Sequence, residues 1–256
     1  MARKDFAPIE ADYEFFRTHS TEAQHDAEDY ARRLGSFADD REAIAMLDFG
    51  CGAGAFTETF LERMSWPPER LTLSLIEPVT AQREHAAARL ARFSAETVRH
   101  AAALTRGSKQ RFDLVLSNHV LYYVEDLAGT LGELVGRLRP GGRLLLAMAD
   151  RANALIDMWD AGFGALGRAV PYHTAEDVVG VLESAGLHFA TTESRYVIRF
   201  EDRPSHRLSI LRFLFGEHLD RMPREKLLAG FDRYVSRGAI EIATHDLHFD
   251  LTLDGS

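Results

Sequence analysis

The sequence has little of several features that would place a protein in a specialised class. It contains one cysteine, Cys51, among 256 residues, so no second cysteine is available for a disulfide or a shared metal site. The formal net charge is -9, with 39 acidic against 30 basic residues, which argues against the basic surface of a nucleic-acid-binding protein. No run of about 18 apolar residues could cross a membrane, and mixed charges follow Met1-Ala2-Arg3-Lys4 instead of an apolar signal core. We therefore expect a cytoplasmic protein whose partner is a small molecule.

Apolar strand-like and helix-like segments alternate between residues 44 and 149, which predicts parallel β-α-β units in an α/β fold. The hydrophobic content of 46% is sufficient for one good core. The expected strands are residues 46–49, 71–76, 97–100, 113–117 and 142–149, and the expected helices are 57–64, 81–93 and 127–138. The turn Arg139-Pro140-Gly141-Gly142 is expected to close the third helix, because proline cannot continue it.

The pattern changes after residue 150. Helices are expected near residues 153–163, 174–184, 205–219 and 224–236. Two alternating segments, 187–200 and 239–253, are suited to an antiparallel pair at the edge of the sheet. The chain contains no repeat or low-complexity tract.

Residues 48–54, Asp-Phe-Gly-Cys-Gly-Ala-Gly, are typical of a buried strand that turns through glycines into a helix. Glycine is needed where the backbone adopts positive φ or approaches a ligand, and a helix start offers unpaired N–H groups. The next strand ends on Glu77, roughly 20 residues further on, where a carboxylate can accept ribose hydroxyls. The alternative is that Glu77 is an ordinary solvated carboxylate at the end of a strand. The glycines predict a nucleotide-like cofactor, and by themselves they also fit a dinucleotide pattern.

Three motifs together resemble class I S-adenosylmethionine-dependent methyltransferases: residues 48–54 with Glu77, the strand 112–118, and Leu-Arg-Pro-Gly-Gly at 138–142. The resemblance implies a Rossmann-like, seven-stranded sheet flanked by helices, whose last strand, 247–253, inserts antiparallel beside the preceding strands. It implies that the glycine loop faces the methionine part of the cofactor, that the acidic strand end holds the ribose, and that residues after the fourth strand line the reaction site. The cofactor contacts expected from it are Asp48, Gly50, Gly52, Gly54, Glu77 and Asn118.

A narrower resemblance, to histamine N-methyltransferases, covers almost the whole chain. Residues 19–24, His-Ser-Thr-Glu-Ala-Gln, are similar to a segment of that family whose glutamate contacts the substrate amine or imidazole, which implies this role for Glu22. The similarity of Glu-Pro-Val-Thr-Ala-Gln at 77–82 implies that Gln82 contacts the cofactor beside the adenosine. Val-Leu-Tyr-Tyr-Val at 120–124 and a pocket tryptophan of the family imply that Tyr122, Tyr123 and Trp159 bind the acceptor.

Two positions depart from that family. Its substrate-binding glutamine is replaced by His119, and the substrate-contacting asparagine of its last strand has no clear equivalent among Thr244, His245 and Asp246. We include His119 and His245 in the expected acceptor site. The acceptor is therefore expected to be histamine-like, namely a small amine or another nitrogen heterocycle.

Methyl transfer from a sulfonium is an in-line displacement, which needs alignment and exclusion of water more than reactive side chains. An ammonium acceptor must first lose a proton, whereas a neutral imidazole nitrogen needs no base. His119 could accept a proton or only orient the acceptor. Glu22 could hold a cation or only serve as a first-turn acid after Ser20-Thr21. We expect these two residues to be the catalytic ones, while the three aromatic residues could also be ordinary core.

Other kinds of site find little support. The remaining histidines are scattered, and the Asn118-His119 pair has no acidic neighbour in the sequence, so no metal is expected. Basic and aromatic residues at 195–200 alternate with period two, which favours a half-exposed strand over an RNA surface.

We therefore expect an S-adenosyl-L-methionine-dependent N-methyltransferase that releases S-adenosyl-L-homocysteine. The alternatives are a small-molecule O-methyltransferase and a non-catalytic S-adenosylmethionine-binding regulatory protein. A monomer or homodimer with no nucleic-acid or membrane partner is expected. Within one compact domain, residues 1–40 are expected to form a helical substrate cover, 41–150 the cofactor-binding core, and 151–256 the rest of the sheet with helical substrate-binding insertions.

Overall fold

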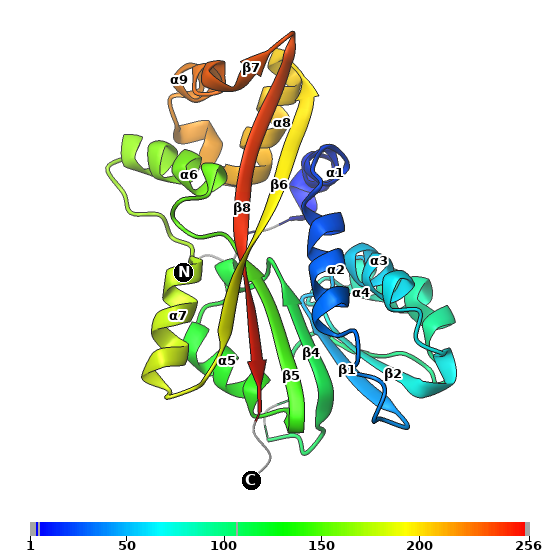
Figure 1. The fold of residues 1–256 in the computed structure, drawn as a ribbon. Helices are drawn as coiled ribbons and strands as arrows, with labels where there is room; N and C mark the ends of the chain where they lie inside the picture. Colours follow the sequence, from blue (N-terminus) through cyan, green and yellow to red (C-terminus); the bar gives the residue numbers. More distant parts are fainter. Residues whose placement is uncertain (1–3, 5, 106, 254–256) are drawn as a thin grey trace.

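The computed structural model describes residue 4 and residues 6–105 and 107–253, and one mixed sheet forms its centre (Figure 1). The strand order is β3-β2-β1-β4-β5-β8-β6, and the short β7 pairs with β8. The strands are β1 (Ile44–Phe49), β2 (Leu71–Ile76), β3 (Arg99–Ala101), β4 (Phe112–Asn118), β5 (Leu138–Met148), β6 (Ala190–Glu201), β7 (Val235–Ser236) and β8 (Ala239–Thr252). Strands β1 to β5 are parallel to one another, and β8 runs antiparallel to β5 and β6. This is the methyltransferase-like sheet expected from the sequence, with the last long strand inserted beside β5.

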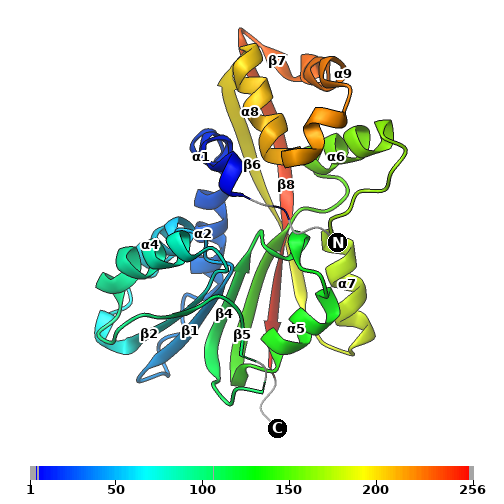
Figure 2. The same ribbon diagram turned by 180° about the vertical axis from the view of Figure 1, so that it is seen from behind.

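Helices cover both faces of the sheet (Figures 1 and 2). Helices α2 (Glu22–Arg33), α3 (Ala55–Met64) and α4 (Thr80–Leu90) lie on one face, and α5 (Leu127–Val135) and α7 (Ala175–Ser184) lie on the other. A hydrophobic core lies on each face of the sheet. Along β4, Leu114 and Leu116 pack into one core and Val115 into the other, because successive side chains of a strand point to opposite faces. Burial on both faces explains why β4 reads as a nearly continuous apolar run.

The antiparallel pair β6–β8 continues beyond the parallel strands. Residues 247–252 of β8 pair with β5, whereas residues 239–246 extend past the carboxyl end of β5 and pair with β6. Helices α1 (Glu10–His19), α6 (Ala154–Ala165), α8 (Pro204–Phe215) and α9 (Arg224–Ala229) gather around this extension (Figures 1 and 2). Both ends of the chain therefore contribute helices near the carboxyl ends of β4 and β5.

Four helix ends differ from the sequence expectation, three of them near a glycine. The helix expected at 81–93 ends at Leu90, and residues 91–93 form a 3-10 turn. The helix expected at 127–138 ends at Val135, so the Arg-Pro-Gly-Gly turn lies inside the segment of β5, where the register with β4 shifts and Gly141 has φ +71°. The helix expected at 205–219 ends at Phe215, before Gly216. The helix expected at 224–236 ends at Ala229, before Gly230, and residues 235–236 form β7.

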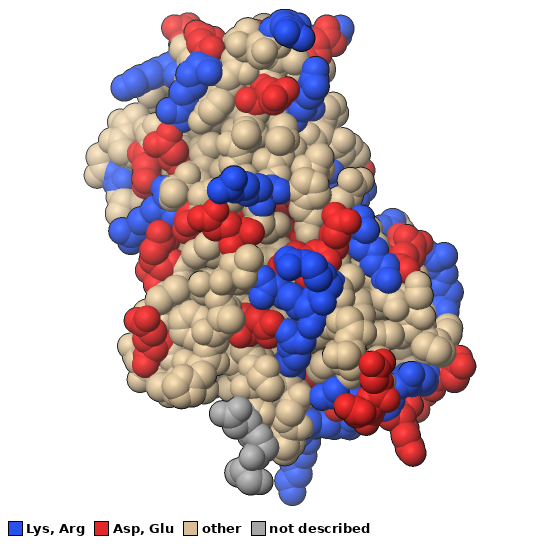
Figure 3. Space-filling view, viewed as in Figure 1, with Lys and Arg blue, Asp and Glu red and all other residues tan. Residues whose placement is uncertain are grey.

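The outer surface carries charges of both signs. On the face drawn in Figure 3, acidic and basic side chains are intermixed over the whole molecule. None of the helices in the described part of the chain is both long enough and apolar enough to cross a membrane.

Candidate active site

The strand order reverses between β1 and β4, so the loops that follow these two strands lie side by side. In open α/β sheets such a reversal creates the crevice in which ligands bind. The glycine loop follows β1, and His119-Val120 follows β4. A Cβ atom on Gly50 would lie 2.4 Å from both methyl carbons of Val120, so the two loops pack directly against each other. The predicted cofactor loop and the predicted acceptor residues therefore meet at one place.

The glycine loop has the backbone that its sequence requires. Gly50, Gly52 and Gly54 have φ values of +81°, +51° and +79°, which residues with a Cβ rarely adopt. A Cβ on Gly54 would lie 3.1 Å from Ala86, so this glycine is needed for close packing on α4. A Cβ on Gly52 would meet no atom nearer than Gln82 Oε1, at 4.0 Å. The open space for a ligand is therefore beside Gly52 and Gln82.

The Glu77 carboxylate lies at the rim of this loop and is 7% exposed. Its Oε2 accepts a hydrogen bond from the Gly52 N–H at 3.2 Å, and its Oε1 accepts one from the Val79 N–H at 2.8 Å. These bonds orient the carboxylate without using all of its acceptor capacity. Asp48 is buried beneath the loop, where it accepts a hydrogen bond from the Thr57 hydroxyl, and burial raises the pKa of Asp48 to about 7. The glycines, Glu77 and Gln82 thus fit a nucleoside ligand, while Asp48 supports the turn.

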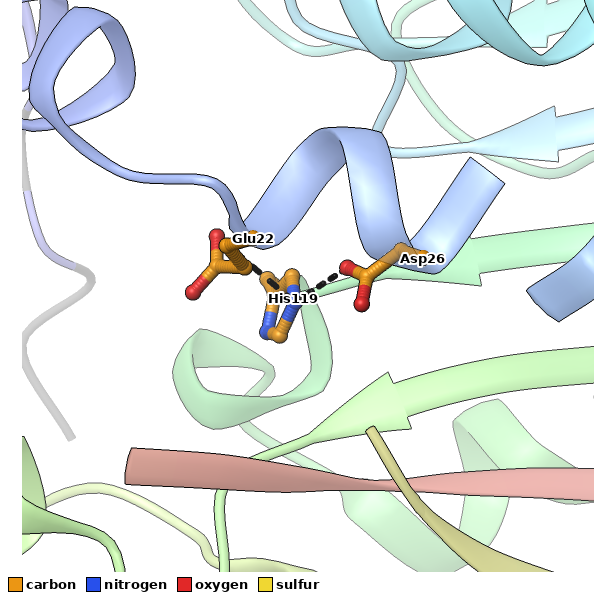
Figure 4. A group of neighbouring side chains, drawn as sticks. All are labelled: Glu22, Asp26 and His119. Atoms are coloured by element: carbon orange, nitrogen blue, oxygen red, sulfur yellow. Dashed lines mark hydrogen bonds and ion pairs between the residues drawn. The ribbon is translucent and has the colours of Figure 1, made fainter. Parts of the chain in front are cut away.

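His119 lies between two carboxylates of α2 (Figure 4). Its Nε2 is 2.9 Å from Asp26 Oδ2 and 3.7 Å from Glu22 Oε2. Glu22 and Asp26 are four residues apart and so share one face of the helix. Helix α2 is held at the sheet edge by its N-terminal residues, since the Thr21 N–H donates to the Val197 carbonyl at 3.0 Å and the Val197 N–H donates to Thr21 Oγ1 at 3.1 Å.

The backbone at His119 is unusual. Its φ is +57°, a left-handed conformation that is uncommon for a residue other than glycine and is often found at functional sites. The His119 N–H donates to the Ala147 carbonyl at 3.0 Å, which ties the loop to the end of β5. The ring Nδ1 lies 3.2 Å from the Tyr122 hydroxyl, which also accepts from the Ala149 N–H at 2.5 Å. The ring is therefore fixed from both of its nitrogen atoms.

Asp26 is the centre of a buried polar network. Its Oδ1 is 2.8 Å from His248 Nε2, and its Oδ2 accepts from Asn118 Nδ2 at 3.1 Å. His248 Nδ1 in turn lies 2.6 Å from Asp29 Oδ2. Burial opposes ionisation of Asp26, but the bonds to His119 and His248 outweigh it and hold its pKa well below the usual range. Asp26 is thus a carboxylate that keeps two imidazoles charged.

The charges around His119 decide its protonation. Burial alone would lower the pKa of His119, but the carboxylates of Glu22, Asp246 and Asp26 together raise it to about 10. Burial raises the pKa of Glu22, an effect that Asp26 increases and His119 decreases. At neutral pH the ring therefore already carries its second proton.

The acidic neighbours of His119 correct the sequence analysis, which found none beside the Asn118-His119 pair. The donor atoms of Glu22, Asp26 and His119 lie within 4.8 Å of one another, a spacing that a metal ion could bridge. However, His119 Nε2 donates to Asp26, which makes the group an ion pair instead of a set of ligands with free lone pairs. The absence of a metal stays a prediction.

The other expected acceptor residues lie at different distances from this cluster. Tyr122 touches His119 and is buried, and Tyr123 is half-buried with its ring 5.6 Å from that of Tyr122. Trp159 is also buried, its ring 5.6 Å from Tyr122, and its Nε1–H donates to the Leu214 carbonyl at 3.0 Å. His245 Nε2 instead lies 3.2 Å from Asp150 Oδ2. The structure thus brings Glu22, Asn118, His119 and Tyr122 together, with Tyr123 and Trp159 behind Tyr122 and His245 bonded elsewhere.

The sequence analysis missed Asp26 and His248, and it mentioned Asp246 only as a neighbour of His245. A local signal existed for each. Asp26 follows Glu22 by one helical turn, and Asp246 and His248 are two residues apart on one face of a strand. In both pairs, polar side chains lie on the face of the helix or strand that packs toward the protein interior.

Comparisons with known proteins bear on the family and the fold. A family model described as a methyltransferase domain matches residues 22–191. Histamine N-methyltransferase A of Xenopus laevis is 25% identical over 180 residues, which are 62% of this chain and 60% of that protein. Malonyl-[acyl-carrier protein] O-methyltransferase of Acetivibrio thermocellus is 34% identical over 108 residues, which are 41% of this chain.

Among solved structures, N-methyltransferase NodS of Bradyrhizobium japonicum has the same fold. Its TM-score is 0.52 at 19% identity, and the match covers 91% of this chain and 98% of that one. The matches to the two curated relatives above cover only 60% and 36% of those proteins. The relatives differ in the atom that they methylate, so they leave the acceptor open.

Proposed function

The chain belongs to the class I S-adenosylmethionine-dependent methyltransferases, and on that premise we propose that it methylates a nitrogen atom of a small amine or nitrogen heterocycle. We assign the space beside Gly52, Glu77 and Gln82 to the cofactor, with Asp48, Gly50 and Gly54 shaping the loop. We also assign Asn118, which ends β4 and donates to Asp26, to the cofactor site. The bound cofactor supplies an electrophilic methyl group on a sulfonium.

The group of buried carboxylates around His119 is the observation that supports a nitrogen atom as the methyl acceptor. Glu22 lies 3.7 Å from the imidazole, and its side chain is only 15% exposed. A carboxylate acceptor would be repelled by Glu22, whereas a protonated amine would gain a charge-assisted hydrogen bond. Tyr122 and Tyr123 add aromatic faces that suit a cation or a flat ring.

We assign different roles to Glu22 and His119. Glu22 holds the cationic group of the acceptor. Because His119 is already protonated at neutral pH, it cannot accept a proton there, and we assign it to orienting the acceptor and balancing the charge of the carboxylates. Residues 1–40, which include α1 and α2, serve as a cover that excludes water from the reacting atoms.

We further propose that the protein acts as a cytoplasmic monomer or homodimer without a nucleic-acid or membrane partner. The net charge of -9 supports the absence of a nucleic-acid partner, and the face drawn in Figure 3 carries mixed charges. The Acetivibrio thermocellus relative is an O-methyltransferase, and O-methylation of a small molecule is therefore the second candidate function.

The test is transfer of a radiolabelled methyl group to panels of amines, nitrogen heterocycles, phenols and carboxylic acids. We expect turnover in the amine and heterocycle panels, and a lower kcat/KM in the variant Glu22→Gln with unchanged affinity for S-adenosylhomocysteine. Turnover of phenols or acids alone would support the O-methyltransferase. Tight cofactor binding without transfer to any acceptor would support a non-catalytic protein.

A further inference from the structure

One carboxylate oxygen of the site has no hydrogen-bond donor. Asp246 lies on β8 and is 1% exposed. Its Oδ1 accepts from Asn153 Nδ2 at 3.0 Å, whereas its Oδ2 is buried without a partner in the described part of the chain. Buried carboxylate oxygens are normally satisfied, so an orphaned one calls for a donor that the protein itself does not supply.

The orphaned oxygen and Glu22 approach the same imidazole nitrogen. Asp246 Oδ2 and Glu22 Oε2 are each 3.7 Å from His119 Nε2, although the two residues come from β8 and α2. Asp26 is fully engaged by His119, His248 and Asn118. Glu22 is already bonded to the Tyr196 side chain, but a carboxylate can accept further donors. The oxygens left for a ligand near His119 therefore belong to Glu22 and Asp246.

The balance of charge favours a cationic ligand. Three carboxylates, Glu22, Asp26 and Asp246, face two imidazoles, His119 and His248. The next carboxylate in the network, Asp29, has its own partner in Arg33 at 2.6 Å. When all three carboxylates are ionised and both imidazoles are charged, one negative charge remains in excess, and a ligand with one positive charge would neutralise it.

We propose that Asp246 is a further catalytic residue, whose Oδ2 binds the acceptor's ammonium group together with Glu22 and accepts the proton that this group must lose. The inference rests on the proposed function and narrows its substrate class to aliphatic primary or secondary amines. An ammonium offers several N–H donors, one for each carboxylate. A neutral ring nitrogen has no proton to give up, and a hydroxyl group has only one donor.

The reaction consists of a proton transfer and a methyl transfer. An N–H bond of the ammonium breaks, and its proton moves to Asp246 Oδ2. The freed lone pair forms the N–C bond while the C–S bond of the donor breaks and its electron pair stays on sulfur. The methylated amine keeps its remaining proton or protons, and Asp246 later returns its own proton to water.

The surroundings of Asp246 suit a proton acceptor. Burial raises the pKa of Asp246 well above its ordinary value, His119 and His248 lower it, and Glu22 and Asp26 raise it further. The raised pKa makes the ionised Asp246 carboxylate a stronger base than an exposed aspartate. The titratable side chains that face it are Glu22, Asp26 and Tyr30 from α2, His119 and Tyr122 from the segment after β4, Tyr196 from β6 and His248 from β8.

The decisive variant is Asp246→Asn, which keeps the shape and removes the proton acceptor. We expect kcat for primary aliphatic amines to fall by about 100-fold or more, the usual effect of losing a general base, and the rise of kcat with pH to disappear. Asp246→Glu should recover part of the rate and the rise with pH. Glu241→Gln is the matched control, because Glu241 lies on the same strand, is exposed, pairs with Arg199, and should leave KM and the pH profile unchanged.

A binding measurement keeps the test independent of turnover. Calorimetry with S-adenosylhomocysteine-saturated protein would compare histamine with 4-(2-hydroxyethyl)imidazole, in which a hydroxyl replaces the amine. We expect the wild type to prefer histamine by at least about tenfold and Asp246→Asn to lose most of that preference. Equal binding of the two compounds by the wild type would overturn the proposal, and this holds even if the asparagine variant does not fold.

The remaining outcomes are equally separable. Retention of the rate and of the pH dependence by Asp246→Asn would overturn the role of Asp246, as would wild-type methylation of ring nitrogens alone. A wild type that methylates no nitrogen acceptor would contradict the proposed function instead.

Discussion

Replacing His119 by glutamine should lower stability in a way that depends on pH. The carboxylates around His119 raise its pKa to about 10, against an ordinary value of 6.5. A group whose pKa is raised by folding stabilises the folded state fully below its unfolded value and loses that contribution as pH rises toward the folded value. His119 therefore stabilises the protein most at about pH 6 and least near pH 10.

The magnitude follows from the size of the shift. Each pKa unit corresponds to about 1.4 kcal/mol, so the shift from 6.5 to about 10 sets an upper bound of about 5 kcal/mol at pH 6. Part of this will be lost because glutamine can still bond to Asp26. We expect the difference between wild type and His119→Gln to be several kcal/mol at pH 6 and to shrink by up to about 1.4 kcal/mol per pH unit above pH 6.5.

The assay is urea unfolding of both proteins at pH 6, 7, 8 and 9. Comparing the two proteins at each pH is essential, because Lys4 has the opposite linkage: burial lowers its pKa to about 7, so its contribution improves as pH rises. That contribution is common to both proteins and cancels in the difference. His85→Gln, on the exposed side of α4, is the matched control and should change the free energy of unfolding by less than about 0.5 kcal/mol. A difference for His119→Gln that does not change from pH 6 to 9 would refute the charged state of His119.

Three further outcomes are expected. Glu77→Gln should weaken S-adenosylhomocysteine binding by about 1.5–3 kcal/mol in calorimetry, because a charged acceptor is lost, and unchanged affinity would remove Glu77 from the cofactor site. Gly50→Ala should lower the melting temperature more than Gly52→Ala. The Cβ added in Gly50→Ala would lie 2.4 Å from Val120, whereas the Cβ added in Gly52→Ala would lie no nearer than 4.0 Å to Gln82. An equal effect of the two variants would mean that the glycine loop and the loop after β4 do not pack as described. Exhaustive dialysis against EDTA should leave methyl transfer unchanged because His119 Nε2 is bonded to Asp26, and activity lost to EDTA and restored by Zn²⁺ or Mn²⁺ would contradict this.

The cofactor half of the site was predictable from the sequence because its parts are local. The glycine loop directly follows β1, and Glu77 directly follows β2, the parallel neighbour of β1. In a β-α-β unit the carboxyl ends of neighbouring strands meet at one edge, so the order of segments already implies that the loop and the acid are close. The alternating segments near the C-terminus likewise predicted the antiparallel pair, whereas four helix ends were misplaced, three of them near glycines.

The acceptor half depended on the tertiary structure. Asp26, His119, Asp246 and His248 come from α2, the loop after β4 and the strand β8, and no sequence spacing links them. Periodicity indicates which side chains of a helix or strand share a face, but it does not say which face of another element they meet. That pairing follows from the register of β8 against β5 and β6 and from the docking of α2 on β6, and a shift of one residue in β8 would turn Asp246 and His248 to the other side of the sheet. The residues were visible in the sequence, but the buried charges that they form exist only in the folded protein.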